Sequence, residues 1–199
     1  MIIGITGCPG SGKTVLAHSI AELDWVLVDA DEIGREVVED DHRVLEQLAD
    51  VFGNDILRGN GTLDRRCLAR KAFGVHSMTE ELNRIVHPSL IERIRSRILE
   101  LRDQGSDAVV DCSLIFEWGI ESLFDVVVAV QARESIRKER LQYRDDRNPE
   151  EIEGMFAAQF AESEKVQRAD IVFSNNGDID RIKAFGQMLS ELPRYFGDR

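Results

Sequence analysis

The feature that most constrains the fold of this chain is a glycine-rich loop close to its N-terminus. Residues 7–14 read Gly-Cys-Pro-Gly-Ser-Gly-Lys-Thr, and they follow an apolar run at residues 1–6. This is the pattern G-x-x-x-x-G-K-[ST] in the setting that it requires, after a buried strand and before a helical pattern. Glycines let successive backbone N–H groups turn toward phosphate oxygens, and the start of the helix adds its positive dipole end. The sequence therefore predicts a loop that binds the phosphates of a nucleoside triphosphate.

Two side chains of this loop carry the expected chemistry. Lys13 can reach the β- and γ-phosphates, and the hydroxyl of Thr14 can ligate Mg²⁺. The alternative is a glycine-rich turn that carries a lysine by chance, and the order of strand, loop and helix argues against it.

Short apolar runs alternate with helical patterns along the whole chain, which predicts an α/β fold with a doubly wound parallel sheet of five strands. The strands are expected at 2–6, 25–29, 108–112, 126–131 and 170–173. The helices are expected at 13–23, 31–39, 42–52, 64–73, 79–104, 135–144, 150–167 and 180–192. Ligands of such sheets bind at the carboxyl ends of the strands.

The 199 residues suit a single domain, but the stretch between the second and third strands is too long for a simple crossover. This mostly helical stretch predicts an inserted substrate-binding subdomain at about residues 60–105. The dipeptide His87-Pro88 is expected to interrupt the helical pattern at 79–104, because a residue before proline avoids the helical conformation.

Composition excludes several classes of protein. A net charge of −12 argues against nucleic acid as a partner, and no apolar run is long enough to span a membrane. No secretory signal is expected from the first residues, and three cysteines without a C-x-x-C pair support neither disulfides nor zinc, so a reducing cytoplasm is expected. Cys8, inside the loop, is either a small filler residue or a site of oxidation.

Acidic side chains at the ends of predicted strands are candidates for catalysis. Asp29 and Asp31 follow the second strand, and one of them could orient an acceptor hydroxyl and take its proton. The alternative for Asp31 is a cap of the next helix, and a cap and a base can share one position, so the catalytic role is favoured for Asp31. Asp111 ends the third strand, where it is either an Mg²⁺ ligand or a cap, and Glu117 carries the same ambiguity.

A basic segment stands out in this acidic chain. Its cations are Arg133, Arg137, Lys138, Arg140, Arg144 and Arg147. Four of the arginines recur at helical spacing along one side, which fits either a solvated face or a lid whose arginine neutralises a transferring phosphoryl group. His87 could contact substrate or simply mark the expected helix break.

The motifs together resemble the dephospho-coenzyme A kinase family over nearly the whole chain. In order, they are GCPGSGKT, VDADEIGREVV, GTLDRR, LNRIVHP, LIFE, RKERLQYRDDR and QFAESEKVQRADIVFSNNG. The resemblance implies a P-loop kinase fold with a lid at about 133–160, and transfer of the ATP γ-phosphoryl group to the ribose 3′-hydroxyl of dephospho-coenzyme A. ATP and dephospho-coenzyme A are the implied partners, with Mg²⁺ as cofactor.

The resemblance also assigns roles to residues. It implies Asp31, Lys13 and Arg140 as catalytic residues, and Thr14 and Asp111 as metal ligands. The implied nucleotide-binding residues are Gly10, Ser11, Gly12, Lys13, Thr14, Val15, Arg144 and Asn176. The implied acceptor-binding residues are Asp29, Arg35, Leu63, Arg66, His87 and Ile115.

The chain departs from the family pattern at Cys8-Pro9, at Val15, where a hydroxyl is lost, and at Ser113, where a proline is usual. A kinase of another small acceptor, such as a nucleoside or a nucleoside monophosphate, is the first alternative. A nucleotide-binding regulatory ATPase is the second. Acceptor-dependent release of ADP distinguishes among the three.

Overall fold

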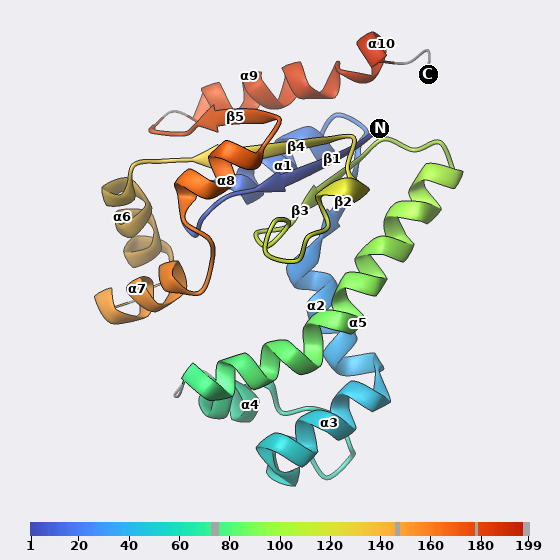
Figure 1. The fold of residues 1–199 in the computed structure, drawn as a ribbon, viewed down its shortest axis with the longest axis vertical. Helices are drawn as coiled ribbons and strands as arrows, with labels where there is room; N and C mark the ends of the chain where they lie inside the picture. The colour runs from blue at the N-terminus through green and yellow to red at the C-terminus, as the bar shows by residue number, and fades with distance from the viewer. Residues whose placement is uncertain (73–75, 146–147, 178, 197–199) are drawn as a thin grey trace. The chain divides into compact units, whose positions relative to one another are not determined.

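A parallel five-stranded sheet forms the centre of the computed structural model, which describes residues 1–72, 76–145, 148–177 and 179–196 (Figure 1). The strands are β1 (Ile2–Thr6), β2 (Val26–Asp29), β3 (Ala108–Asp111), β4 (Val126–Gln131) and β5 (Ile171–Ser174). Their order is β2-β3-β1-β4-β5, and every pairing is parallel. The predicted α/β sheet is confirmed, with each strand boundary within one residue of its expected place.

The strands are nearly all apolar because both faces of the sheet are covered. On one face, Ile3 and Ile5 pack with Leu16 and Ile20 of α1 (Lys13–Ala21) and with Ile182 of α9 (Ile179–Ser190). On the other face, a Cβ atom at Gly4 would come within 2.8 Å of Ile115 Cδ1 and 2.9 Å of the Phe124 ring. The glycine lets these two side chains pack directly on β1.

The chain divides into two compact units. The first, Met1–Asp29 and Ile98–Arg199, holds the sheet, and the second, Ala30–Arg97, is helical. The further helices of the first unit are η2 (Glu121–Leu123), α6 (Glu134–Asp145), α7 (Pro149–Ala157), α8 (Glu162–Arg168) and α10 (Pro193–Phe196). The second unit holds α2 (Ala30–Asp40), α3 (His42–Phe52), η1 (Asn54–Ile56), α4 (Arg65–Ala72) and most of α5 (His76–Asp103). A substrate subdomain at 60–105 and a lid at 133–160 remain predictions.

The helix break expected at His87-Pro88 is wrong. Helix α5 continues through Pro88, and Figure 1 shows it bent partway along its length. Proline removes one backbone donor and crowds the preceding turn, which kinks a helix without having to end it. Burial of Ile85, Val86 and Leu90 on either side of the proline stabilises the continuous helix.

The single helix expected at 150–167 is also wrong, since α7 ends at Ala157 and α8 begins at Glu162. Long-range hydrogen bonds hold the intervening segment out of helical geometry. The Phe160 N–H donates to Glu117 Oε1 at 2.8 Å, and the Phe160 carbonyl accepts from Cys8 Sγ at 3.8 Å. These partners lie far away in the sequence, so helical periodicity does not reveal them.

Among the residues that the structure describes, no helix is both long enough and apolar enough to cross a membrane.

Candidate active site

The glycine-rich loop lies between the end of β1 and the start of α1. Gly10 and Gly12 have positive φ angles of 77° and 96°, which L side chains rarely adopt. A Cβ atom at Gly10 would lie 2.6 Å from the Arg137 carbonyl oxygen, and one at Gly12 would collide with the Asn175 side-chain amide. Both positions therefore require glycine, for conformation and for space.

Ser11 is the most enclosed polar residue of the loop. It is fully buried, and its Oγ has no hydrogen-bond partner among the described residues. Its carbonyl accepts from Asn175 Nδ2 at 2.6 Å. A buried hydroxyl without a partner is costly unless a ligand satisfies it, so the loop fits a phosphate group.

Cys8 occupies the same loop as a buried residue. Burial raises the pKa of its thiol above the ordinary value of 9.0. Because the thiolate is the reactive form, the thiol is poorly reactive at neutral pH. The structure therefore favours the reading of Cys8 as a filler residue.

Arg140 of α6 contacts the loop directly. Its Nη1 donates to the carbonyls of Gly10 at 3.1 Å and Ser11 at 3.3 Å, and its Nη2 donates to the Asn175 carbonyl at 3.2 Å. Burial lowers the pKa of this guanidinium, although arginine stays charged at neutral pH. A fixed cation therefore lies at the edge of the loop.

The other arginines of the basic segment differ from one another. Arg137 is buried, stacks on the Phe156 ring at 4.5 Å and faces Glu162, so its role is structural. Arg133 and Arg144 are exposed, and Arg147 lies outside the described residues. The Arg133 N–H donates to Asn176 Oδ1 at 2.8 Å, which fixes the segment that follows β5.

Two carboxylates end adjacent strands in register. Asp29 of β2 pairs with Asp111 of β3, and Asp111 pairs in turn with Ile5 of β1. Neighbouring strands lie about 4.8 Å apart, so two like charges are held close together. Asp111 is 7% exposed. Two carboxylates, which are hard oxygen donors, therefore lie side by side at the carboxyl edge of the sheet.

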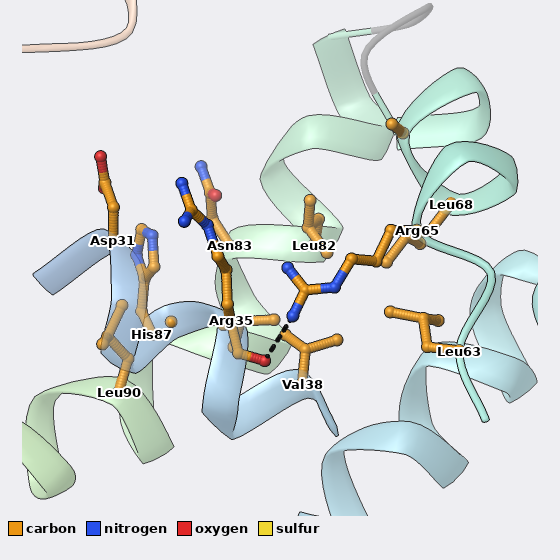
Figure 2. Close-up of a pocket in the computed structure, with 13 residues that line it drawn as sticks. Asp31, Arg35, Val38, Leu63, Arg65, Leu68, Leu82, Asn83, His87 and Leu90 are labelled. Carbon is orange, nitrogen blue, oxygen red and sulfur yellow. Dashed lines mark hydrogen bonds between the residues drawn. The ribbon is translucent and has the colours of Figure 1, made fainter. Parts of the chain in front are cut away.

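The second unit contains a pocket of about 260 Å³ formed by α2, α4 and α5 (Figure 2). Asp31, Arg35 and Val38 lie at helical spacing on one face of α2 and line it. In Figure 2 the polar ends of Asp31 and Arg35 point in the same direction. Its apolar lining includes Leu63, Leu68, Leu82 and Leu90. The pocket therefore offers both an apolar wall and charged groups.

The predicted acceptor residues are only partly brought together here. Asp31, Arg35, Leu63 and His87 line the pocket. Arg66 is exposed and is not among the lining residues, whereas Arg65 is. Helix phase explains this, because Arg65, Leu68 and Ala69 share one face of α4.

Arg65 is a residue that sequence reasoning missed. Its Nε donates to Glu39 Oε1 at 3.0 Å, and its Nη2 donates to the Arg35 carbonyl at 3.1 Å. The helical spacing of Arg65, Leu68 and Ala69 is the signal in the sequence that places Arg65 on the same face as Leu68. Ile115 lies instead in the first unit, buried against Gly4 of β1.

The His87 imidazole is half-buried, and desolvation lowers its pKa below the ordinary value of 6.5. The unfolded chain therefore binds more protons than the folded protein just below that value, and stability falls as the pH drops through it. The glutamine of His87→Gln does not titrate. As the pH falls from about 7.5 to about 5.5, we therefore expect the wild type to lose unfolding free energy relative to His87→Gln. Urea denaturation at both pH values checks this, and a pH-independent difference would contradict it.

Comparisons with known proteins agree over most of the chain. The family model described as CoaE: Dephospho-CoA kinase matches residues 1–181. A dephospho-CoA kinase of Corynebacterium glutamicum is 38% identical over 188 residues, covering 94% of each protein. The crystal structure of TT1252 from Thermus thermophilus superposes with a TM-score of 0.76 at 30% identity, covering 96% of this chain and 97% of that one. A dephospho-CoA kinase from Campylobacter jejuni shares the fold, with a TM-score of 0.69 at 18% identity over 96% of each chain.

Proposed function

Because the chain belongs to the dephospho-CoA kinase family, it is a phosphotransferase with dephospho-CoA kinase activity, and we propose how its residues divide the work. The first unit holds ATP, and the pocket of the second unit holds dephospho-CoA. The strand β2 of the first unit leads directly into α2 of the second, so only Ala30 separates Asp29 from Asp31. In the sequence, the proposed base therefore follows the last residue of β2 by two positions.

The phosphates of ATP are proposed to bind the loop at residues 10–15. Backbone N–H groups at the start of α1 have no helical acceptors and can donate to phosphate oxygens. Lys13 supplies a charge toward the β- and γ-phosphates, and Ser11 Oγ is the buried hydroxyl that a ligand would satisfy. Arg140, already bonded to the loop, would neutralise charge on the transferring group. Val15, 42% exposed, Arg144 and Asn176 are proposed to contribute at the rim of the nucleotide site.

Thr14 and the carboxylates at the strand ends are proposed as the residues that would hold Mg²⁺. The donor set is one hydroxyl with Asp111 and Asp29, and hard oxygen ligands of this kind suit Mg²⁺. When bound, the ion would offset negative charge on the β- and γ-phosphates. The in-register pairing of Asp29 with Asp111 supports this site, because it brings two carboxylates to the same edge of the sheet.

Asp31 is proposed to orient the ribose 3′-hydroxyl of dephospho-CoA and to accept its proton as the oxygen attacks the γ-phosphorus. The acceptor carries a diphosphate and a long arm in which amide groups alternate with short apolar segments. Arg35 and Arg65 offer cations to the diphosphate, and the leucines of the pocket offer apolar contact to the arm. His87 provides an uncharged polar edge at neutral pH.

The single observation that carries this assignment is the presence of Asp31 and Arg35 on the same helix face of one pocket. ADP release is to be measured with dephospho-CoA, with a nucleoside, with a nucleoside monophosphate and without an acceptor. We expect release to depend on dephospho-CoA. Equal ADP release without an acceptor would indicate a regulatory ATPase. Faster ADP release with a nucleoside or a nucleoside monophosphate would indicate a kinase of another acceptor.

The role of Thr14 leads to a prediction about metal dependence. Thr14→Val keeps the shape of the side chain and removes the hydroxyl, so we expect a higher Mg²⁺ concentration at half-maximal rate and a kcat lower by roughly 10–10². Thr14→Ser restores the hydroxyl and is expected to behave like wild type. Titration of initial rates with MgCl₂ measures the effect, and an unchanged Mg²⁺ dependence in Thr14→Val would contradict the assignment.

A further inference from the structure

Helix α8 carries three charged side chains spaced three residues apart, and each one pairs with a different element of the first unit. The pairs are Glu162 with Arg137 of α6, Lys165 with Glu117 in the loop after β3, and Arg168 with Glu121 of η2. Helical spacing aligns the three on one side of α8. A short helix thus links three separate parts of the unit by charge.

Lys165 is the centre of this arrangement. The residue is fully buried, and its ammonium donates to the Ser113 carbonyl at 2.5 Å, Glu117 Oε1 at 2.7 Å and Gln159 Oε1 at 3.2 Å. A lysine ammonium has three protons, so every donor finds an acceptor. A buried charge is tolerated only with such complete pairing, and losing one partner leaves the other charge uncompensated.

These acceptors lead to the loop that binds ATP and to the segment that follows α7. The Ser113 carbonyl also accepts from Thr6 Oγ1 at 2.9 Å, and Thr6 is the last residue before the loop. Glu117 Oε1 also accepts from the Phe160 N–H at 2.8 Å. Lys165 therefore joins the entry of the loop to the place where the chain returns from α7.

The other end of the segment formed by α6 and α7 is held by the same helix. Glu162 Oε1 accepts from the Ala132 N–H at 3.2 Å and faces Arg137 Nε at 3.4 Å. The carbonyl of Arg137 packs on Gly10 of the loop, and Arg140 lies three residues further along α6. Helix α8 thus anchors the chain both where it enters α6 and where it leaves α7.

We propose that Lys165 is a positioning residue that influences phosphoryl transfer by holding Arg140 in place. The ion pair with Glu117 sets where the segment of α6 and α7 meets the sheet, and so holds the guanidinium of Arg140 in register with the loop. This rests on the catalytic role of Arg140 in the proposed function. A displacement of about 1 Å in a charge-stabilising group can cost about 10²-fold in rate, so a distant anchor can matter.

The test is a double-mutant cycle that joins the paired change Lys165→Met/Glu117→Gln to Arg140→Ala. The paired change removes both charges, and glutamine keeps an acceptor for the Phe160 N–H. We expect the paired variant to fold, with kcat lower by about 10–10² and the KM for dephospho-CoA unchanged. In the Arg140→Ala background, the same paired change is expected to have no further effect on kcat.

The matched control is Glu164→Gln, which removes a charge of α8 whose ion pair, with Arg168 at 3.7 Å, lies within the helix itself, and its kcat is expected to equal that of wild type. A wild-type kcat in Lys165→Met/Glu117→Gln would overturn the role of Lys165 and leave the role of Arg140 intact. The same fractional loss of kcat with and without Arg140 would do so too. A wild-type kcat in Arg140→Ala would overturn the role of Arg140 as well. If the paired variant does not fold, Gln159→Ala takes its place in the double-mutant cycle. It removes one acceptor of the Lys165 ammonium and no charge, and its loss of kcat is likewise expected to disappear in the Arg140→Ala background.

Discussion

An Asp31→Asn variant is expected to lose a factor of about 10²–10⁴ in kcat, because asparagine matches the shape of aspartate but cannot accept the proton of the acceptor hydroxyl. Asp31 is exposed and lies in the first turn of α2, so the unfolding free energy is expected to change little. Steady-state turnover of dephospho-CoA measures the effect. Because asparagine still offers an oxygen to the hydroxyl, the KM for dephospho-CoA is expected to stay close to wild type.

The neighbouring carboxylate provides the control for Asp31. Glu32 is exposed on the same turn of α2 and is not among the residues that line the pocket. Glu32→Gln removes the same charge one residue away and is expected to leave kcat unchanged. If both variants lost rate equally, the effect would come from local charge. If Asp31→Asn kept a wild-type kcat with intact folding, its role as a base would be wrong.

The second large effect is expected for Arg140→Ala, with kcat lower by about 10³–10⁵, the range for arginines that stabilise a transferring phosphoryl group. The cation lies at the loop and donates to the carbonyls of Gly10 and Ser11. Arg140→Lys keeps the charge but loses the planar guanidinium, so its kcat is expected to lie between those of wild type and Arg140→Ala. Single-turnover measurements with saturating ATP isolate this step from product release.

Lys138→Ala is the control for Arg140, since it removes a cation from the same helix. Lys138 pairs with Glu134 and Glu153 at the surface. Surface pairs of this kind contribute little, so both kcat and stability are expected to stay near wild type. A comparable loss of rate in both variants would show that the basic segment acts by its total charge, contrary to a specific role for Arg140.

The sequence predicted the sheet, the loop and the α/β order because these depend on local patterns. The loop at 7–14 contains all of its own determinants, and the strands are continuous apolar runs. Contacts between distant residues explain what was missed. The break after Ala157 depends on a hydrogen bond from the Phe160 N–H to Glu117, 43 residues away, and the buried Lys165 ammonium donates to the Ser113 carbonyl, 52 residues away.

The sequence predicted site residues that belong to a motif, but it did not predict which side chains of a motif face the pocket. Asp31, Arg35, Leu63 and His87 do line one pocket, but the motif L-D-R-R cannot tell which arginine faces it. The phase of α4, which depends on where that helix begins, selects Arg65. The helix through Pro88 was missed for a related reason, because packing of its neighbours outweighed the local preference of proline.

The site to which the phosphoryl group is transferred can be identified directly by ³¹P NMR after incubation of the protein with ATP, Mg²⁺ and dephospho-CoA. We expect a new phosphomonoester coupled to the ribose 3′ proton, formed in equal amount with ADP, and we expect its rate of formation to fall about 10²–10⁴-fold in Asp31→Asn. A phosphate at any other position, or ADP formed without an acceptor at the same rate, would contradict it.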